Sequence, residues 1–195
     1  MNKKNHNESL HQPLITGYSD SYIKMTKDRV IFLSEDITDK VGIELSAMLL
    51  YYDSQEDHDS PINLYIHTDG GANTGLANIY DVMQMIHTPI KTILLGKCYS
   101  AGAWILAAGS KGMRFALRSS KVMIHGSQFF FPIPGHDFTN SKNYYEFVDA
   151  ENNAMLKVMA KHTGQTFAKV KEDCQTERWM SAQEALEYGI IDHII

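Results

Sequence analysis

The sequence predicts an α/β fold in which a mostly parallel sheet is flanked by helices. Short apolar runs of strand length alternate with segments whose apolar residues recur at helical spacing. This alternation is typical of parallel sheets, because a helix in each crossover returns the chain to the same edge. In such folds, binding and catalytic residues gather at the carboxyl ends of the strands. The residues that follow each predicted strand are therefore the first candidates for a functional site.

The first half of the chain supplies three predicted strands and two predicted helices. In order, these are residues 29–33 (RVIFL), 41–49, 62–67 (INLYIH), 74–86 and 90–95 (IKTILL). The strands are rich in β-branched residues, whereas the helical segments carry apolar residues three and four positions apart. Pro89 ends the second helix, because a proline disfavours the helical conformation in the residue before it.

The second half begins with a turn at Gly96 that leads into a helix of small residues. In order, the expected elements are that helix up to residue 110, strands at 114–117 (RFAL) and 121–124 (KVMI), a loop at 126–140, and helices at 142–161 and 181–189. The loop contains two prolines and two glycines, which exclude a regular helix. The last helix begins with a serine N-cap followed three residues later by Glu, and ends at a glycine.

One domain is expected, preceded by a flexible segment. Residues 1–20 are polar and show no apolar periodicity, so we expect them to be flexible. Residues 21–195 are expected to form a single domain, because 195 residues suffice for one core of ordinary size and not for two.

Composition excludes several classes of protein. With 44% hydrophobic and 21% charged residues, the chain matches a globular average, and a net charge of -5 argues against nucleic acid as a partner. The longest apolar stretch, residues 101–109, is about half the length of a membrane span, and the start lacks an apolar signal core. We therefore expect a cytoplasmic protein with no membrane partner. Cys98 and Cys174 fit no zinc-binding spacing and are expected to be reduced thiols.

Ser100 and His125 are the candidates for nucleophilic chemistry. Ser100 follows the third strand and begins the small-residue helix, where free backbone N–H groups would flank its hydroxyl. An isolated Ser at such a turn is more often a helix N-cap. His125 ends the strand KVMI and could be a general base or a hydrogen-bonded structural residue. The presence of both residues at strand ends favours a nucleophile with its base.

Gly70 and Gly71 directly follow the second predicted strand. They allow a tight turn and a close approach of the main chain to a ligand, so that their N–H groups could stabilise an oxyanion. A turn that merely needs positive φ explains them equally well. The chain has no GxxxxGK[ST] motif and is therefore not a P-loop nucleotide hydrolase.

From Arg29 to Ile195 the chain resembles the ClpP family, the proteolytic subunits of ATP-dependent Clp proteases (serine peptidase family S14). The resemblance rests on the ordered segments RVIFL, LYIHTDGG, IYDVMQMI, a SAGA-type serine turn, AAGSKGMRFAL, VMIH, HTGQ and MSAQEALEYGIIDHII. It implies the ClpP/crotonase-like spiral of repeated β-β-α units, with a protruding handle helix in the region of about residues 126–161.

The resemblance also implies a Ser-His-acid triad. Ser100 would be the nucleophile and His125 the general base that takes the serine proton and returns it to the leaving amine. The backbone N–H groups of Gly71 and Ala101 would form the oxyanion hole. At the position of the family's third triad member, an Asp, this chain has Glu177.

The chain departs from the family's pattern in three places. Glu177 keeps the negative charge, but its extra methylene group must be accommodated, and Asp173 is the alternative orienting residue. Thr68 and Asp69 replace a Ser-Pro pair. Residues 129–131, three successive Phe, lie where the family has a glycine-rich strand, and they could fill an interface between subunits or pack under a loop. The changes at residues 68–69 and 129–131 lie beside the family's substrate groove, so they affect which peptides are expected to be cleaved.

The family's partners are also implied. Its members form heptameric rings stacked into a tetradecamer, either of one chain or mixed with a ClpP paralogue, and an AAA+ unfoldase such as ClpX, ClpA or ClpC feeds in unfolded proteins. The unfoldase uses the ATP, so no cofactor is expected here. No metal is expected either, because the His residues form neither HExxH nor another metal-binding pattern. Residues 1–20 would form an axial loop. Tyr65 and Met85 could line the grooves that dock the unfoldase, or belong to the core.

The expected activity is that of an ATP-dependent Clp endopeptidase, a serine protease that degrades unfolded proteins. One alternative is a catalytically weak or regulatory paralogue in a mixed ring, suggested by Glu177. Another is an acyl-CoA enzyme of the crotonase type, which shares the fold and the use of backbone N–H groups. The pair Ser100 and His125 argues against both alternatives. Lys97 lies too close to Ser100 in sequence to be a convincing base for a Ser-Lys peptidase.

Overall fold

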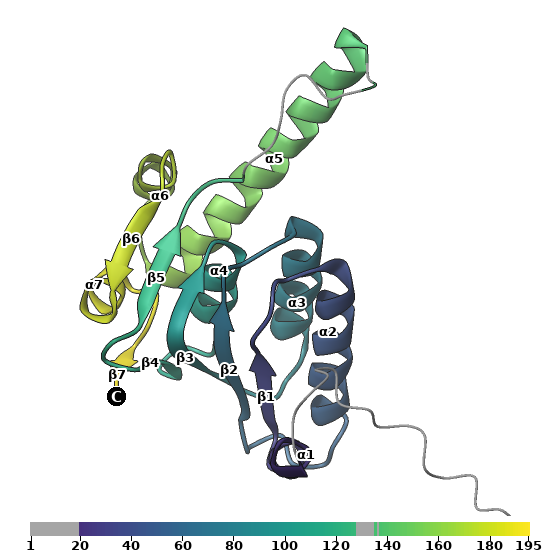
Figure 1. The fold of residues 1–195 in the computed structure, drawn as a ribbon, viewed down its shortest axis with the longest axis vertical. Coiled ribbons are helices and arrows are strands. Elements are labelled where there is room, and N and C mark those ends of the chain that lie inside the picture. Colours follow the sequence, from purple (N-terminus) through teal and green to yellow (C-terminus); the bar gives the residue numbers. More distant parts are fainter. Residues whose placement is uncertain (1–19, 128–134, 136) are drawn as a thin grey trace, which may run out of the picture.

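The computed structural model describes residues 20–127, 135 and 137–195, and in this part of the chain strands of one sheet are flanked by helices (Figure 1). The strands are β1 (Val30–Leu33), β2 (Ile62–Thr68), β3 (Ile90–Tyr99), β4 (Arg114–Ala116), β5 (Lys121–Ile124), β6 (Arg178–Ser181) and β7 (His193–Ile194). The helices are α1 (Asp20–Lys27), α2 (Asp39–Asp53), α3 (Asn73–Met85), α4 (Ala101–Ala107), α5 (Phe138–Thr163), α6 (Phe167–Asp173) and α7 (Ala182–Tyr188).

The sheet is mostly parallel, which confirms the predicted fold class. Its main path runs β1-β2-β3-β4-β7, and every pair on this path is parallel. A branch leaves β3, which also pairs with β5 in parallel, and β5 pairs with β6 in the antiparallel direction. Because β3 and β5 are parallel, their carboxyl ends lie at the same edge of the sheet.

Strand β3 is longer than the sequence predicts. Gly96, where a turn was expected, has φ 74° and donates its N–H to Ser120 Oγ (3.1 Å), so that the chain bends without leaving the sheet. The half of β3 before Gly96 pairs with β4, and the half after it pairs with β5. The added length carries the sheet forward to Tyr99, directly before Ser100.

The core lies between the sheet and its helices. In β2, every second residue is buried, beginning with Ile62, and its neighbours on the opposite face are more exposed. All seven residues of α4 (AGAWILA) are buried, because small side chains let this helix approach the sheet. The contact between α2 and α3 is equally close: a Cβ atom at Gly42 would lie 2.7 Å from the Cα of Gly75.

Helix α5 begins earlier than the predicted helix at residues 142–161 and ends later. Asp137 caps its first turn by accepting a hydrogen bond from the N–H of Asn140 (2.8 Å), and Gly164 ends it with φ 76°. The helix has 26 residues and extends away from the sheet (Figure 1). The predicted flexible segment, apart from Asp20, and the Phe triplet at 129–131 lie outside the described residues.

The closing helix agrees with the prediction, whereas several short elements were not predicted. Ser181 and Glu184 form the reciprocal hydrogen bonds of a capping box, and Gly189 ends the helix with φ 91°. The elements missed are α1, α6, β6 and β7, which have between two and eight residues each. None of the helices in the described ranges is long and apolar enough to cross a membrane.

Candidate active site

Ser100 occupies a strained position between β3 and α4. Its φ of 51° and ψ of -130° are rare for a residue with a side chain, and such strain costs about 1–3 kcal/mol. The backbone is held on both sides, since the N–H of Ser100 bonds to Met123 O (2.9 Å) and the Ala103 N–H bonds to Ser100 O (2.8 Å). The hydroxyl makes no capping hydrogen bond to α4, although Ser100 stands at the N-cap position.

The hydroxyl of Ser100 instead faces His125. The distance from Ser100 Oγ to His125 Nε2 is 2.7 Å, which is hydrogen-bond distance. The parallel pairing of β3 with β5 explains why the two side chains are close. Tyr99 of β3 stands opposite Met123 of β5. Ser100 directly follows Tyr99, and His125 lies two residues after Met123. The structure thus brings together the two residues that the sequence singled out as nucleophile and base.

The turn at Gly70 and Gly71 packs directly against Ser100. Gly70 has φ 102°, and a Cβ atom there would lie 2.7 Å from the Cβ of Ser100. Gly71 has φ 150°, and a Cβ atom there would overlap with the carbonyl oxygen of Ile37. Only glycine fits both requirements at these two positions.

The expected oxyanion donors are free of acceptors in the described part of the chain. On either side of Gly71, the Ile37 N–H bonds to Gly70 O and the Ala72 N–H bonds to Ile37 O, both at 2.7 Å. These bonds fix the turn while leaving the N–H of Gly71 itself without an acceptor among the described residues. The same holds for the N–H of Ala101, the first residue of α4. Both groups are therefore available to an oxyanion bound beside Ser100.

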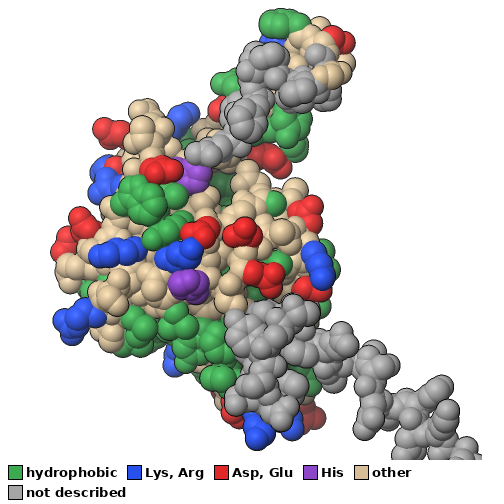
Figure 2. Space-filling model, viewed as in Figure 1, with side chains coloured by type: hydrophobic (Ala, Val, Ile, Leu, Met, Phe, Trp, Pro, Cys, Tyr) green, Lys and Arg blue, Asp and Glu red, His purple; other side chains and the backbone are tan. Residues whose placement is uncertain are grey.

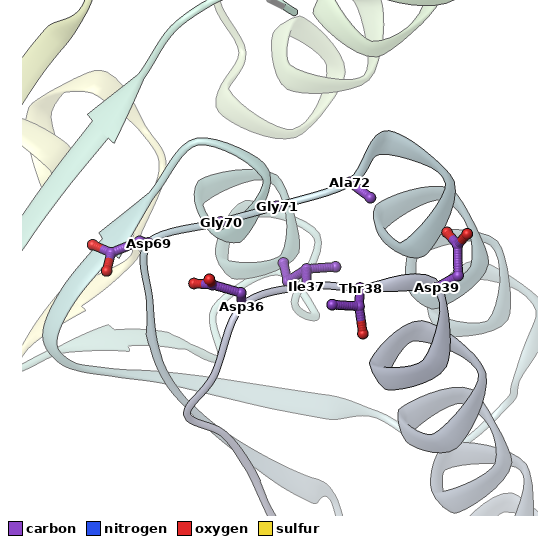
Figure 3. Close-up of a pocket in the computed structure, with 8 residues that line it drawn as sticks. All are labelled: Asp36, Ile37, Thr38, Asp39, Asp69, Gly70, Gly71 and Ala72. Carbon is purple, nitrogen blue, oxygen red and sulfur yellow. The ribbon is translucent and has the colours of Figure 1, made fainter.

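A pocket of about 520 Å³ lies beside this turn (Figure 3). It is lined by Asp36, Ile37, Thr38, Asp39, Asp69, Gly70, Gly71 and Ala72. Asp69 is paired with Lys97, whose Nζ lies 2.5 Å from Asp69 Oδ2. Lys97 is thus held in an ion pair with a carboxylate, whereas a lysine that activates a serine must be neutral and face the serine hydroxyl.

Glu177 and His125 leave the sheet at the same end, and no hydrogen bond joins them in the described part of the chain. The β5–β6 ladder ends at the pair Ile124 and Arg178, so that His125 and Glu177 leave the ladder at the same end. The carboxylate of Glu177 accepts a hydrogen bond from Trp179 Nε1 (3.2 Å). Within the described ranges, no hydrogen bond joins His125 to Glu177 or to Asp173.

Asp173, the alternative orienting residue, belongs to a separate network. Its side chain is only 6% exposed and accepts hydrogen bonds from Lys169 (2.5 Å), Arg178 (2.5 Å) and the Tyr188 hydroxyl (2.9 Å). Burial alone would raise the pKa of Asp173, but these hydrogen bonds and positive charges outweigh it and lower the pKa below its ordinary value. Asp173 therefore ties α6 to β6 and α7, away from His125.

Two further expectations concern the surface. Tyr65 is half-buried and stacks on Phe32 with ring centroids 5.2 Å apart, whereas Met85 is 61% exposed at the end of α3.

Acidic and basic side chains are interspersed on the described part of the face shown in Figure 2. No cluster of three or more metal-ligating side chains occurs among the residues that the structure describes.

Sequence reasoning did not single out Trp179. This residue lies in a strand of four residues, where a single aromatic side chain has no periodic pattern to mark it. In the structure its ring packs edge-on against Tyr99, with centroids 4.9 Å apart, and its indole N–H reaches Glu177. Trp179 therefore links the residue before Ser100 to the expected third member of the triad.

A model of the Clp protease family matches residues 16–195 of the chain. The matched range begins ahead of α1 and includes every strand of the described sheet. It also contains Ser100, His125, Glu177 and both glycines of the turn.

Proposed function

The chain belongs to the Clp protease family, a family of serine peptidases, and we propose that it is the serine endopeptidase subunit of an ATP-dependent Clp protease. Its substrates would be unfolded proteins that an AAA+ unfoldase feeds into a ring chamber. The observation that carries the proposal is the 2.7 Å contact between Ser100 Oγ and His125 Nε2 at the end of two parallel strands.

The first half of the reaction forms an acyl-enzyme. His125 Nε2 accepts the hydroxyl proton as Ser100 Oγ bonds to the carbonyl carbon of the peptide. The carbonyl π electrons move to the oxygen, and the N–H groups of Gly71 and Ala101 stabilise that oxyanion. When the oxyanion collapses, the C–N bond breaks and His125 gives its proton to the leaving amine.

The second half releases the enzyme. A water molecule gives a proton to His125 Nε2 and attacks the acyl carbon, and a second oxyanion forms between the same N–H groups. Collapse of this intermediate breaks the bond to Ser100 Oγ, which recovers its proton from His125. One water is consumed for each peptide bond, and no ATP is needed in this chain.

The geometry of the imidazole sets the role of the third residue. For Nε2 to accept the serine proton, Nδ1 must carry hydrogen, and a carboxylate beside Nδ1 holds that tautomer and stabilises the imidazolium. Glu177 is the candidate, because it leaves the ladder at the same end as His125 and carries the required charge. Asp173 is unsuited, since three side chains already occupy its carboxylate.

The family's assembly supports a ring enclosing these sites. We infer heptameric rings stacked as a tetradecamer in the cytoplasm, of this chain alone or mixed with a paralogue. Exposed Met85, together with Tyr65, would face the unfoldase. The extended substrate would pair with the backbone after Gly71, beside the pocket of Figure 3.

A second candidate function is that of a weakly active or regulatory paralogue. The observation favouring it is the hydrogen bond of Glu177 to Trp179 in place of His125. A triad without its third member retains part of its rate, because the oxyanion hole and substrate binding remain. The two candidates therefore differ in the rate of cleavage by this chain alone.

Cleavage of a short fluorogenic peptide tests the proposal. The purified chain, alone and with an unfoldase, is compared with Ser100→Ala and His125→Ala. We expect hydrolysis by the unaltered chain and a loss of roughly a thousandfold or more in kcat for each variant, with unchanged thermal unfolding. Equal rates in all three would contradict the assignment of Ser100 and His125. A trace rate that rises only on mixing with an active paralogue would favour the regulatory role.

A further inference from the structure

Three side chains, those of Tyr99, Met123 and Trp179, share one face of the sheet beside the candidate site. Residues that stand opposite each other in a sheet point to the same face, whereas His125 directly follows β5 and Glu177 directly precedes β6. The antiparallel register pairs Met123 with Trp179, and the parallel register pairs Met123 with Tyr99. His125 and Glu177 therefore leave the two strands at the same end, and the indole of Trp179 lies on the face that carries Met123 and Tyr99.

Two hydrogen-bond donors are candidates for the carboxylate of Glu177 at this end of the strands. The indole Nε1–H of Trp179 lies 3.2 Å from Oε2 and holds it in the structure. The other donor is Nδ1 of His125, one residue beyond the last pair of the ladder. Within the described ranges, the ring of His125 makes one hydrogen bond, between Nε2 and Ser100 Oγ, and Nδ1 makes none.

The indole is held in place by Tyr99. The two rings meet edge to face, with an interplanar angle of 73°. Tyr99 is itself the last residue of β3, directly before Ser100, and the indole that packs against it is 55% exposed. The Glu177 side chain has several rotatable bonds, and the hydrogen bond from the indole N–H selects the position of its carboxylate.

We propose that Trp179 is a positioning residue that holds the Glu177 carboxylate away from His125 and thereby sets the activity of this chain. The inference rests on the proposed function, because it concerns the third member of the same triad. In the observed arrangement, the Ser100–His125 pair acts without a carboxylate behind the imidazole. Release of Glu177 from the indole lets the carboxylate turn to Nδ1 of His125 and stabilise the imidazolium of the transition state.

The test uses Trp179→Phe, which removes the indole N–H and keeps an aromatic ring against Tyr99. It is measured in the unaltered background and in Glu177→Gln, as a double-mutant cycle on kcat and KM for a short fluorogenic peptide. We expect Trp179→Phe to raise kcat roughly threefold to tenfold with KM unchanged, the size that one exposed hydrogen bond to a charged group allows. In the Glu177→Gln background we expect no increase.

Each outcome decides the inference. A kcat that is unchanged or lower in Trp179→Phe overturns it, because the indole would then be neutral or would support the carboxylate in its working position. An equal increase in the Glu177→Gln background also overturns it, since the effect would not pass through Glu177. Thermal unfolding and ring assembly serve as controls that a purely structural effect would change.

Failure of the proposed function gives a different pattern. If hydrolysis does not depend on Ser100 in the unaltered chain or in Trp179→Phe, both the peptidase assignment and this inference fail. If hydrolysis depends on Ser100 in both but the cycle shows no coupling between Trp179 and Glu177, only the inference fails.

Discussion

The backbone N–H of Ser100 donates to the carbonyl oxygen of Met123 at 2.9 Å, so β3 and β5 stay hydrogen-bonded up to the residue that carries the hydroxyl. This bond explains how a serine is held at φ 51°. It also fixes the distance to His125, which lies two residues after Met123. The strain at Ser100 is thereby offset by the pairing of two strands, as expected where a site is held by its scaffold.

Gly71→Ala tests the steric requirement of the turn. The new Cβ overlaps with the Ile37 carbonyl and stands at φ 150°, so we expect a loss of about 2–4 kcal/mol in the free energy of unfolding. The matched control is Gly112→Ala, at φ 83° with nothing within 4 Å of the new Cβ, which should cost about 1 kcal/mol from strain alone. Urea unfolding measures both. Equal losses would show that the Ile37 contact does not constrain the turn.

Asp192→Asn tests the buried pair of Asp192 with Arg114. Arg114 Nη2 lies 2.6 Å from Asp192 Oδ1, and the two side chains are 6% and 16% exposed. Removing one partner of a buried pair costs about 3–5 kcal/mol, so we expect Asp192→Asn to lower the free energy of unfolding by that amount at pH 7. A loss below about 1 kcal/mol, the range of exposed pairs, would contradict this account.

The same pair predicts a pH dependence of stability. Burial raises the pKa of Asp192, but the hydrogen bonds and charge of Arg114 outweigh it, and the pKa falls below its ordinary value of 3.8. The stabilisation is therefore complete above pH 3.8 and is lost as the pH falls through the lowered pKa. The pKa values of Asp53 and Asp173 are also lowered, so protonation of these two carboxylates at low pH destabilises the fold as well. The difference in unfolding free energy between the unaltered chain and Asp192→Asn, measured by urea at several pH values, should therefore shrink below pH 3.8.

Substitutions of Asp173 and Glu177 should differ in their effect on the free energy of unfolding. Asp173→Asn weakens three hydrogen bonds in a side chain that is 6% exposed, and we expect it to cost about 1–3 kcal/mol of unfolding free energy. Glu177 is exposed, so Glu177→Gln should change stability by less than about 0.5 kcal/mol. Thermal unfolding compares the two. A larger loss for Glu177→Gln would show that its carboxylate is structural.

The two thiols should be unreactive in the folded chain. Burial raises the pKa of Cys98 far above its ordinary value and raises the pKa of Cys174 to about 12. We therefore expect no alkylation by iodoacetamide at pH 8 in the folded protein and alkylation of both thiols in guanidinium. Intact mass spectrometry counts the adducts. Rapid modification of the native chain would mean that these segments open readily.

The elements that could be predicted from sequence are those with continuous apolar patterns. Strands β1 and β2 and helix α3 lie within one residue of their predicted bounds, because β-branched runs and helical spacing identify them locally. The parallel sheet follows from their alternation and places Ser100 and His125 at one edge. Helix α6 and strand β6 were missed, since seven and four residues of mixed polarity carry no clear period.

Other features of the site depend on contacts that no local pattern records. The continuation of β3 past Gly96 depends on a change of partner from β4 to β5. The φ of 51° at Ser100 depends on the hydrogen bond to Met123. The hydrogen bond from Trp179 Nε1 to Glu177 depends on side-chain conformations, which a linear motif does not specify.

Covalent labelling of Ser100 tests directly whether its hydroxyl is an activated nucleophile. The purified chain is incubated with a fluorophosphonate probe beside Ser100→Ala and Glu177→Gln, and the adduct is weighed intact and mapped by peptide mass spectrometry. We expect one adduct per chain on Ser100, none in Ser100→Ala, and a retained adduct in Glu177→Gln, because the Ser100–His125 pair forms without Glu177. An adduct that persists in Ser100→Ala, or no adduct even after an unfoldase is added, would contradict the assignment of Ser100 as an activated nucleophile.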